Sequence, residues 1–147
     1  MAVEHFGGKG DVTALAELLK TVVRDYKELI AYQKGYELTI LIYRLTDTFP
    51  KEEMYGLTSQ IRRAAVSIPS NIAEGFMRGA KEYAQFLKIS LGSAAEVETQ
   101  LSLSKDLGYC KSEDFITAQA LTTEVLRLLA SYIKRVNERL NTSKKNK

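Results

Sequence analysis

The sequence predicts an all-α protein that folds as an up-down-up-down four-helix bundle. Apolar residues recur at steps of three and four along most of the 147-residue chain. No segment shows the alternation of apolar and polar residues that is typical of a β-strand. Helix-interrupting residues are sparse, with two prolines and nine glycines. Long amphipathic helices joined by short connections pack most naturally as such a bundle.

The N-terminal segment predicts a flexible lead-in followed by an extra helix. Residues 1–10 include three glycines, and Asp11 is a residue type that often caps helices. Helical spacing places five apolar residues on one face, namely Leu15, Leu18, Leu19, Val22 and Val23. We therefore assign residues 1–27 to an N-terminal extension that precedes the bundle.

The first two helices of the bundle are separated by Pro50. One is expected over residues 28–47, because Leu38, Leu41, Ile42 and Leu45 follow steps of three and four. The next is expected to begin near Lys51, and its apolar face contains Met54, Leu57, Ile61, Ala64, Ile68 and Ile72. Pro69 falls inside this pattern and predicts a kink there, or a division into two pieces.

The last two helices show heptad spacing. The fourth stretch places Tyr83, Leu87, Ser90, Ala94, Val97, Leu101 and Ser104 on one seam. After Gly108, Ser112 is a candidate N-cap for a final helix, whose seam contains Phe115, Ala118, Thr122, Val125, Leu129, Tyr132 and Val136. These patterns predict a bundle domain over residues 28–141 and a basic, disordered tail over residues 142–147.

Composition excludes several classes of function. The apolar fraction of 45% and the charged fraction of 27% are typical of a folded soluble domain. The longest run without a charge is the stretch between Arg63 and Glu74, far short of the ~20 residues that a membrane-spanning helix needs. A single histidine, His5, and a single cysteine, Cys110, are too few for a histidine-based triad or a conventional zinc site. We expect a cytoplasmic, non-enzymatic protein with no cofactor or metal.

Four polar residues lie at spacings that place them on one helix face close to the apolar stripe: Gln60, Ser67, Asn71 and Glu74. They could line a polar pocket or a pore. Alternatively, they form a hydrogen-bonded network that fixes helix register and a subunit contact, because buried polar groups require partners. We favour the structural interpretation.

Arginines and lysines provide candidate sites for nucleic acid. Arg62 and Arg63 point about 100° apart on a helix, so we expect one to pair with a carboxylate such as Glu74 or Glu98 inside the assembly and the other to meet phosphate. For at least one of them we favour a solvated or intersubunit salt bridge. From residue 127 onward there is one acidic residue, Glu138, and seven basic ones: Arg127, Lys134, Arg135, Arg139, Lys144, Lys145 and Lys147. Such a region attracts phosphate. Alternatively, its cations only solubilise the chain and complement the helix dipole.

The block from Tyr55 to Gly75, YGLTSQIRRAAVSIPSNIAEG, resembles the signature of a bacterial family. These are four-helix bundle proteins encoded in intervening sequences of large-subunit ribosomal RNA genes. Flanking pieces agree, including FLKIS from Phe86 and ETQL from Glu98, and the match covers roughly residues 29–140. This sequence departs from the family in its extension and at Tyr32, where the family usually has tryptophan.

The resemblance implies a homopentameric barrel without accepted catalytic residues. It also implies kinship with the accessory variability proteins of diversity-generating retroelements, which bind nucleic acid and partner a reverse transcriptase. Our first hypothesis is a non-enzymatic, pentameric helical scaffold that binds RNA or DNA electrostatically. The alternative is a protein-interaction adaptor of a retroelement or an rRNA-associated system that does not contact nucleic acid directly.

Overall fold

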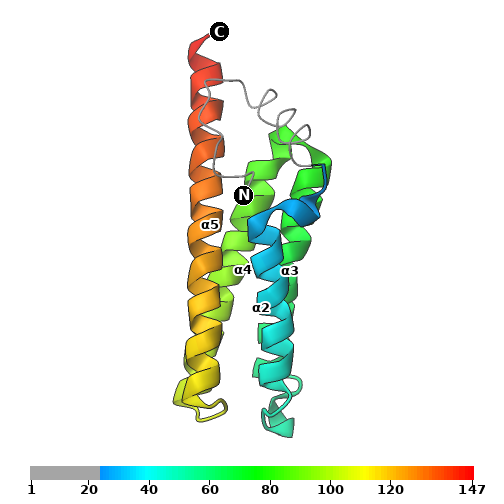
Figure 1. Ribbon diagram of the computed structural model, residues 1–147, viewed down its shortest axis with the longest axis vertical. Coiled ribbons are helices and arrows are strands. Elements are labelled where there is room, and N and C mark those ends of the chain that lie inside the picture. The colour runs from blue at the N-terminus through cyan, green and yellow to red at the C-terminus, as the bar shows by residue number, and fades with distance from the viewer. Residues whose placement is uncertain (1–23) are drawn as a thin grey trace.

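The computed structural model describes residues 24–147, which form four long helices and two short 3-10 helices and contain no strand. In chain order these elements are η1 (Tyr26–Glu28), α2 (Ile30–Thr46), η2 (Lys51–Glu53), α3 (Leu57–Arg78), α4 (Ala80–Asp106) and α5 (Ser112–Lys145). The long helices lie side by side and alternate in direction (Figure 1). The predicted four-helix bundle is therefore confirmed. The extra helix predicted over residues 11–23 lies outside the described residues.

The start of α3 differs from the sequence prediction. The chain forms η2 after Pro50, and α3 begins only at Leu57 rather than near Lys51. The reason is local, because the Glu53 carboxylate accepts a hydrogen bond of 2.8 Å from the Leu57 backbone N–H. It thus caps one of the donors that a helix leaves unpaired at its N-terminus. At the other end, Gly79 joins α3 to α4 with a φ of 102°, a conformation that favours glycine.

Pro69 does not divide α3, which is one continuous element on both sides of it. Proline lacks an N–H, so the carbonyl of Ala65 loses its usual partner four residues along the helix. The Thr39 hydroxyl of α2 lies 2.9 Å from this carbonyl oxygen, and 2.8 Å from that of Gly35. This hydroxyl has one proton, which the two carbonyls share, so a side chain of the neighbouring helix replaces part of the donor that Pro69 lacks.

Gly35 of α2 packs closely against α3 beside Pro69. A Cβ placed on Gly35 would lie 2.9 Å from Cγ2 of Ile68 and 3.6 Å from Cδ of Pro69. Contacts below 3.0 Å are essentially never made by real Cβ atoms. The absence of a side chain at Gly35 is therefore what allows the two backbones to come together.

The core confirms the heptad register predicted for the last two helices. Leu87 and Val97 are completely buried and Leu101 is 1% exposed, as their seam positions require. The other large side chains that are buried almost completely come from α2, α3, α5 and the residue before α2: Leu29, Leu38, Ile42, Ile61, Ile68, Ile72, Val125 and Leu129. A single continuous core thus runs between the four helices.

The last helix continues further than expected. We predicted a disordered tail from residue 142, but α5 extends to Lys145. No proline or glycine interrupts residues 112–145, and the cations of the last turn complement the negative end of the helix dipole. With 34 residues, α5 is about 51 Å long and extends beyond the other helices (Figure 1). No helix among residues 24–147 combines the length and apolar character needed to cross a membrane.

Candidate nucleic-acid interface

Charge is divided between the two halves of α5. Residues 112–126 contain Glu113, Asp114 and Glu124 and no lysine or arginine. From residue 127 to the end of the helix, Glu138 is the sole acidic residue among six basic ones: Arg127, Lys134, Arg135, Arg139, Lys144 and Lys145. The helix is therefore acidic near the α4–α5 connection and basic toward its C-terminus.

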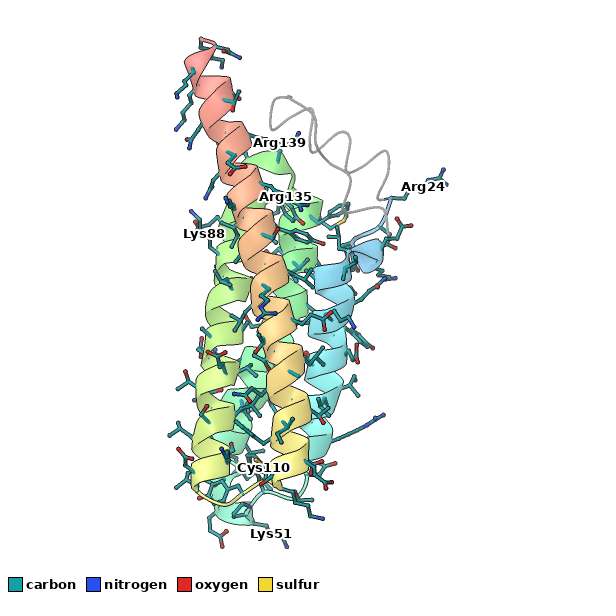
Figure 2. All side chains as sticks on the ribbon, turned by 60° about the vertical axis from the view of Figure 1, so that its left-hand side comes forward. Arg24, Lys51, Lys88, Cys110, Arg135 and Arg139 are labelled. Carbon is teal, nitrogen blue, oxygen red and sulfur yellow. The ribbon has the colours of Figure 1, made fainter. Side chains whose placement is uncertain are left out.

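The neighbouring helix α4 carries charge in the matching order. Its first half contains Lys81, Lys88 and Glu82, which is a net charge of +1. Its second half contains Glu96, Glu98, Asp106 and Lys105, which is a net charge of −2. Because α4 and α5 run in opposite directions, the first half of α4 lies beside the second half of α5 (Figure 1). In Figure 2, Lys88 projects from the same half of the bundle as Arg135 and Arg139. The two helices thus build one positively charged region.

We call this region the basic end and define it by Lys81 and Lys88 of α4 and the six basic residues of α5 named above. Sequence reasoning missed Lys81 and Lys88, because each is isolated in the sequence. Only the antiparallel packing of α4 against α5 brings them to the α5 cations. The heptad seams of the two helices were the signal that could have found them.

Two buried tyrosines lie in this half of α4 and α5. Tyr83 of α4 and Tyr132 of α5 are both buried, at 7% and 8% exposure. Burial raises the pKa of Tyr83 above its ordinary value, and the nearby Tyr132 raises it further. Desolvation disfavours the charged phenolate, so Tyr83 is held in its neutral form.

The cations of α5 occupy two neighbouring faces. Arg127 and Lys134 are exposed and lie seven residues apart, so they share a face two turns apart. Arg135 is exposed and Arg139 is half-buried, and they lie one turn apart on the adjacent face. Arg135 and Arg139 each interact with other groups of the protein. Lys144 and Lys145 are exposed and continue the series of cations to the last turn of α5.

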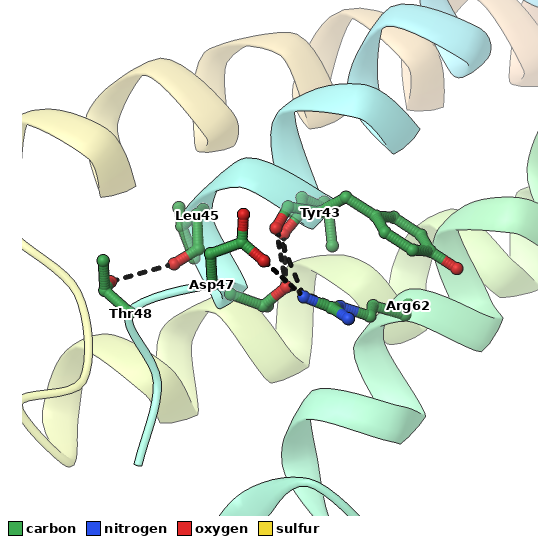
Figure 3. Close-up of polar contacts among 7 residues, drawn as sticks. Tyr43, Leu45, Asp47, Thr48 and Arg62 are labelled. Carbon is green, nitrogen blue, oxygen red and sulfur yellow. Dashed lines mark hydrogen bonds and ion pairs between the residues drawn. The ribbon is translucent and has the colours of Figure 1, made fainter. Parts of the chain in front are cut away.

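Arg62 has a structural position between α3 and the end of α2 (Figure 3). Its Nε donates to the Thr46 hydroxyl at 2.8 Å, and its Nη2 lies 3.2 Å from Oδ1 of Asp47. The guanidinium also stands 4.6 Å from the centre of the Tyr43 ring. Thr46 donates its own proton to the Ile42 carbonyl, so its oxygen is available to accept from Arg62. Arg62 therefore pairs with Asp47, and not with the expected Glu74 or Glu98.

Arg63 lies on a different face and bridges α3 to α4. Its Nη2 lies 3.0 Å from Oε2 of Glu96 and 3.2 Å from Oε1 of Gln60. Both charged side chains are about half exposed, at 60% and 45%. Glu96 was not among the partners expected from the sequence, because only the packing of α3 against α4 brings it close to Arg63.

The four predicted network residues do not form one network. Asn71 donates to the carbonyl and to the hydroxyl of Ser67, both at 2.8 Å, and the Ser93 hydroxyl of α4 lies 2.9 Å from that of Ser67. Gln60 instead contacts Arg63, and Glu74 pairs with Arg78 at 3.0 Å on the surface. Ser67 and Asn71 thus link α3 to α4, whereas Gln60 and Glu74 belong to separate exposed pairs.

No group of three or more histidine, cysteine, aspartate or glutamate residues that could hold a metal ion occurs among residues 24–147. The single histidine, His5, lies outside this range. Cys110 is half-buried in the connection between α4 and α5, where burial raises the pKa of its thiol. The basic end is therefore the candidate site that the described residues define most clearly.

The fold and this surface define a helical bundle protein with a charged, exposed candidate interface. The family described as 23S rRNA-intervening sequence protein matches residues 27–131, and the chain belongs to this family. No curated protein matches the chain. Among solved structures it resembles a protein of unknown function from the S23 ribosomal protein family of Bacteroides thetaiotaomicron, at 27% identity and a TM-score of 0.64. The alignment covers 71% of this chain and 99% of that one.

Arg62 and Arg63 should respond differently to replacement by lysine. Lysine has no planar fork, so Arg62→Lys loses the paired contacts with Thr46 and Asp47 and is expected to lower the free energy of unfolding by about 1–2 kcal/mol. Arg63→Lys changes a half-exposed ion pair, for which ~0.2–1 kcal/mol is typical. Urea unfolding followed by circular dichroism measures both. Equal losses in the two variants would contradict the structural role of Arg62.

Proposed function

We propose that the protein is a non-enzymatic, homo-oligomeric helical scaffold that binds RNA or DNA electrostatically through its basic end. The division of charge along α4 and α5 is the observation that carries this proposal. The dipole of α5 accounts for cations in its last turn, but it does not account for Lys81 and Lys88, which lie in the N-terminal half of α4. An anionic polymer, by contrast, requires positive charge over a continuous surface.

The dimensions of the basic end suit a phosphate backbone. Arg127 and Lys145 are eighteen residues apart on α5, which corresponds to about 27 Å along the helix. A nucleic-acid strand carries a phosphate charge every few ångströms, so several phosphates could lie along this length. Contacts of this kind neutralise phosphates and release counterions without reading base sequence. We therefore propose binding that tolerates many sequences.

Apolar side chains at the opposite end support self-association. Around η2 and the α4–α5 connection, Tyr55 is 93% exposed, Met54 is 55%, Leu107 is 56% and Ile116 is 61%. Exposed apolar surface of this kind commonly marks a protein–protein contact. Association there would leave the basic ends available for nucleic acid, and each added subunit would repeat the cationic surface.

The family match and the solved relative support the proposal but do not identify the ligand. The family name refers to intervening sequences of 23S rRNA, and the solved relative is assigned to the S23 ribosomal protein family. Both names refer to ribosomal RNA or to the ribosome, and this supports the proposal of an RNA ligand. The pentameric state, the kinship with retroelement accessory proteins and a reverse transcriptase as partner are proposals that derive from the sequence resemblance described above.

Assembly is testable by sedimentation equilibrium. At micromolar concentration we expect a mass about five times that of the 16.5 kDa chain. Tyr55→Asp should weaken association, because it places a charge in the exposed apolar group near η2. Met77→Asp is the matched control, since Met77 is 70% exposed at the other end of α3. A mass of 16.5 kDa for the unmodified protein would show that the scaffold does not form.

Nucleic-acid binding is testable by fluorescence anisotropy with labelled RNA and DNA of unrelated sequences. We expect affinity to fall steeply with salt, with a slope of log K against log salt of about −0.9 per duplex phosphate contact. Lys134→Ala combined with Lys144→Ala should weaken binding about equally for all sequences and flatten this slope. The matched control combines Lys51→Ala with Lys111→Ala, which removes two exposed lysines from the opposite end.

Two results would overturn the electrostatic proposal. One is the absence of binding at low salt, and the other is binding that changes neither with salt nor with the Lys134 and Lys144 replacements. Either result, obtained with protein that retains its helical circular dichroism, would favour the adaptor hypothesis. In that case the basic end would serve to solubilise the protein and complement the α5 dipole.

A further inference from the structure

An apolar groove runs between α2 and α3 on the outside of the bundle. Its volume is about 320 Å³, and its lining includes Tyr26, Tyr32, Tyr36, Ile40, Val66 and Pro69. Three of these side chains remain substantially exposed, with Tyr36 at 55%, Ile40 at 41% and Val66 at 41%. We call this feature the α2–α3 groove. Aromatic and aliphatic walls of this kind fit the apolar face of an amphipathic helix.

The chain enters the described structure at one end of this groove. Tyr26 is a lining residue, and its ring packs 5.1 Å from that of Tyr32, between centroids. Just before it, the Arg24 backbone N–H donates to Glu28 at 3.2 Å and the Asp25 carboxylate accepts from the Lys27 backbone N–H at 3.0 Å. Residues 1–23 are therefore tethered within a few residues of the groove.

The sequence of this tethered segment has the pattern that the groove requires. The five apolar residues between Leu15 and Val23 follow helical spacing, as noted above. As a helix, residues 11–23 would be about 20 Å long, whereas the groove runs about 12 Å along α2 from Tyr32 to Ile40. Residues 24–29 would then connect two antiparallel helices, and six residues is an ordinary length for such a connection.

We propose that residues 11–23 of the same chain dock as a helix in the α2–α3 groove, antiparallel to α2. Leu15, Leu18 and Val22 would then face the groove, on the side formed by Tyr36, Ile40 and Val66. A short tether gives the segment a millimolar effective concentration, so it has an advantage over a second copy or another protein.

The segment is an addition of this chain to the family fold. The family match begins at residue 27, and the Bacteroides relative is aligned over 99% of its own length with only 71% of this chain. Docking in cis would therefore give this protein a fifth helix and would close a surface that is otherwise available to partners. This inference is independent of nucleic-acid binding at the basic end.

A single-tryptophan reporter in the full-length chain tests the proposal, because the protein contains no tryptophan. Ile40→Trp places the reporter in the groove, and Ile89→Trp places it on α4 at nearly the same exposure, 42% against 41%. Leu18→Glu combined with Val22→Glu disrupts the apolar face of the segment. Thr13→Glu combined with Thr21→Glu adds the same charge on the opposite face and is the matched control.

In the otherwise unmodified chain, the Ile40→Trp protein should emit at shorter wavelength and resist acrylamide better than the Ile89→Trp protein. The Leu18 and Val22 replacements should shift the Ile40→Trp emission to the red and raise its acrylamide quenching several-fold. The Thr13 and Thr21 replacements should leave both unchanged, and the Ile89→Trp protein should respond to neither pair.

The proposal is overturned if the Ile40→Trp emission does not respond to the Leu18 and Val22 replacements. It is also overturned if the shielding of Ile40→Trp disappears on dilution while those replacements have no effect, since a second copy would then cover the groove. Anisotropy titrations on the same variants distinguish this outcome from a failure of nucleic-acid binding, because the basic end is unchanged in all of them.

Discussion

The close approach of α2 and α3 around Pro69 is the constraint on which the arrangement of the first half of the bundle depends. Pro69 removes a donor from α3, and the Thr39 hydroxyl of α2 replaces part of it at the Ala65 carbonyl, at 2.9 Å. This hydrogen bond requires the helices to be near each other, and Gly35 permits that because a Cβ there would lie 2.9 Å from Ile68. A helix-breaking residue thus becomes a point of attachment between helices.

Several surface features follow from this contact. It holds the outer residues of α2 beside those of α3, so that Tyr36, Ile40 and Val66 border one groove. Further along the same pair of helices, Arg62 reaches Thr46 and Asp47 at the end of α2. In the other half of the bundle, the antiparallel packing of α4 and α5 brings Lys81 and Lys88 to the cations of α5 (Figure 2).

The sequence predicted the features that arise from local periodicity. The seam positions Leu87, Val97 and Leu101 are buried as their spacing requires, and the four helices follow in the expected order. The family was recognisable from the uninterrupted block of residues 55–75, and the family match confirms it. In each case the information lies within a single segment of the chain.

Features that depend on contacts between segments could not be predicted in the same way. The sequence left open whether Pro69 divides α3, and the Thr39 hydroxyl that contacts the Ala65 carbonyl belongs to another helix. Arg62 and Arg63 find Asp47 and Glu96, whose proximity is created only by packing. Gln60 and Glu74 are not part of the predicted polar network, because they pair on the surface with Arg63 and Arg78. The α4 lysines of the basic end were missed for the same reason.

The central claim, that a missing side chain at Gly35 allows the α2–α3 contact, is tested most directly by comparing two glycine replacements. Both residues lie inside helices, but a Cβ at Gly92 would meet nothing within 4 Å. We predict that Gly92→Ala raises the free energy of unfolding by about 0.5–1 kcal/mol through helix propensity alone. Gly35→Ala should lower it by about 1–2 kcal/mol, because overpacking against Ile68 outweighs the same gain. An equal stabilisation in both variants, measured by urea unfolding, would contradict the account.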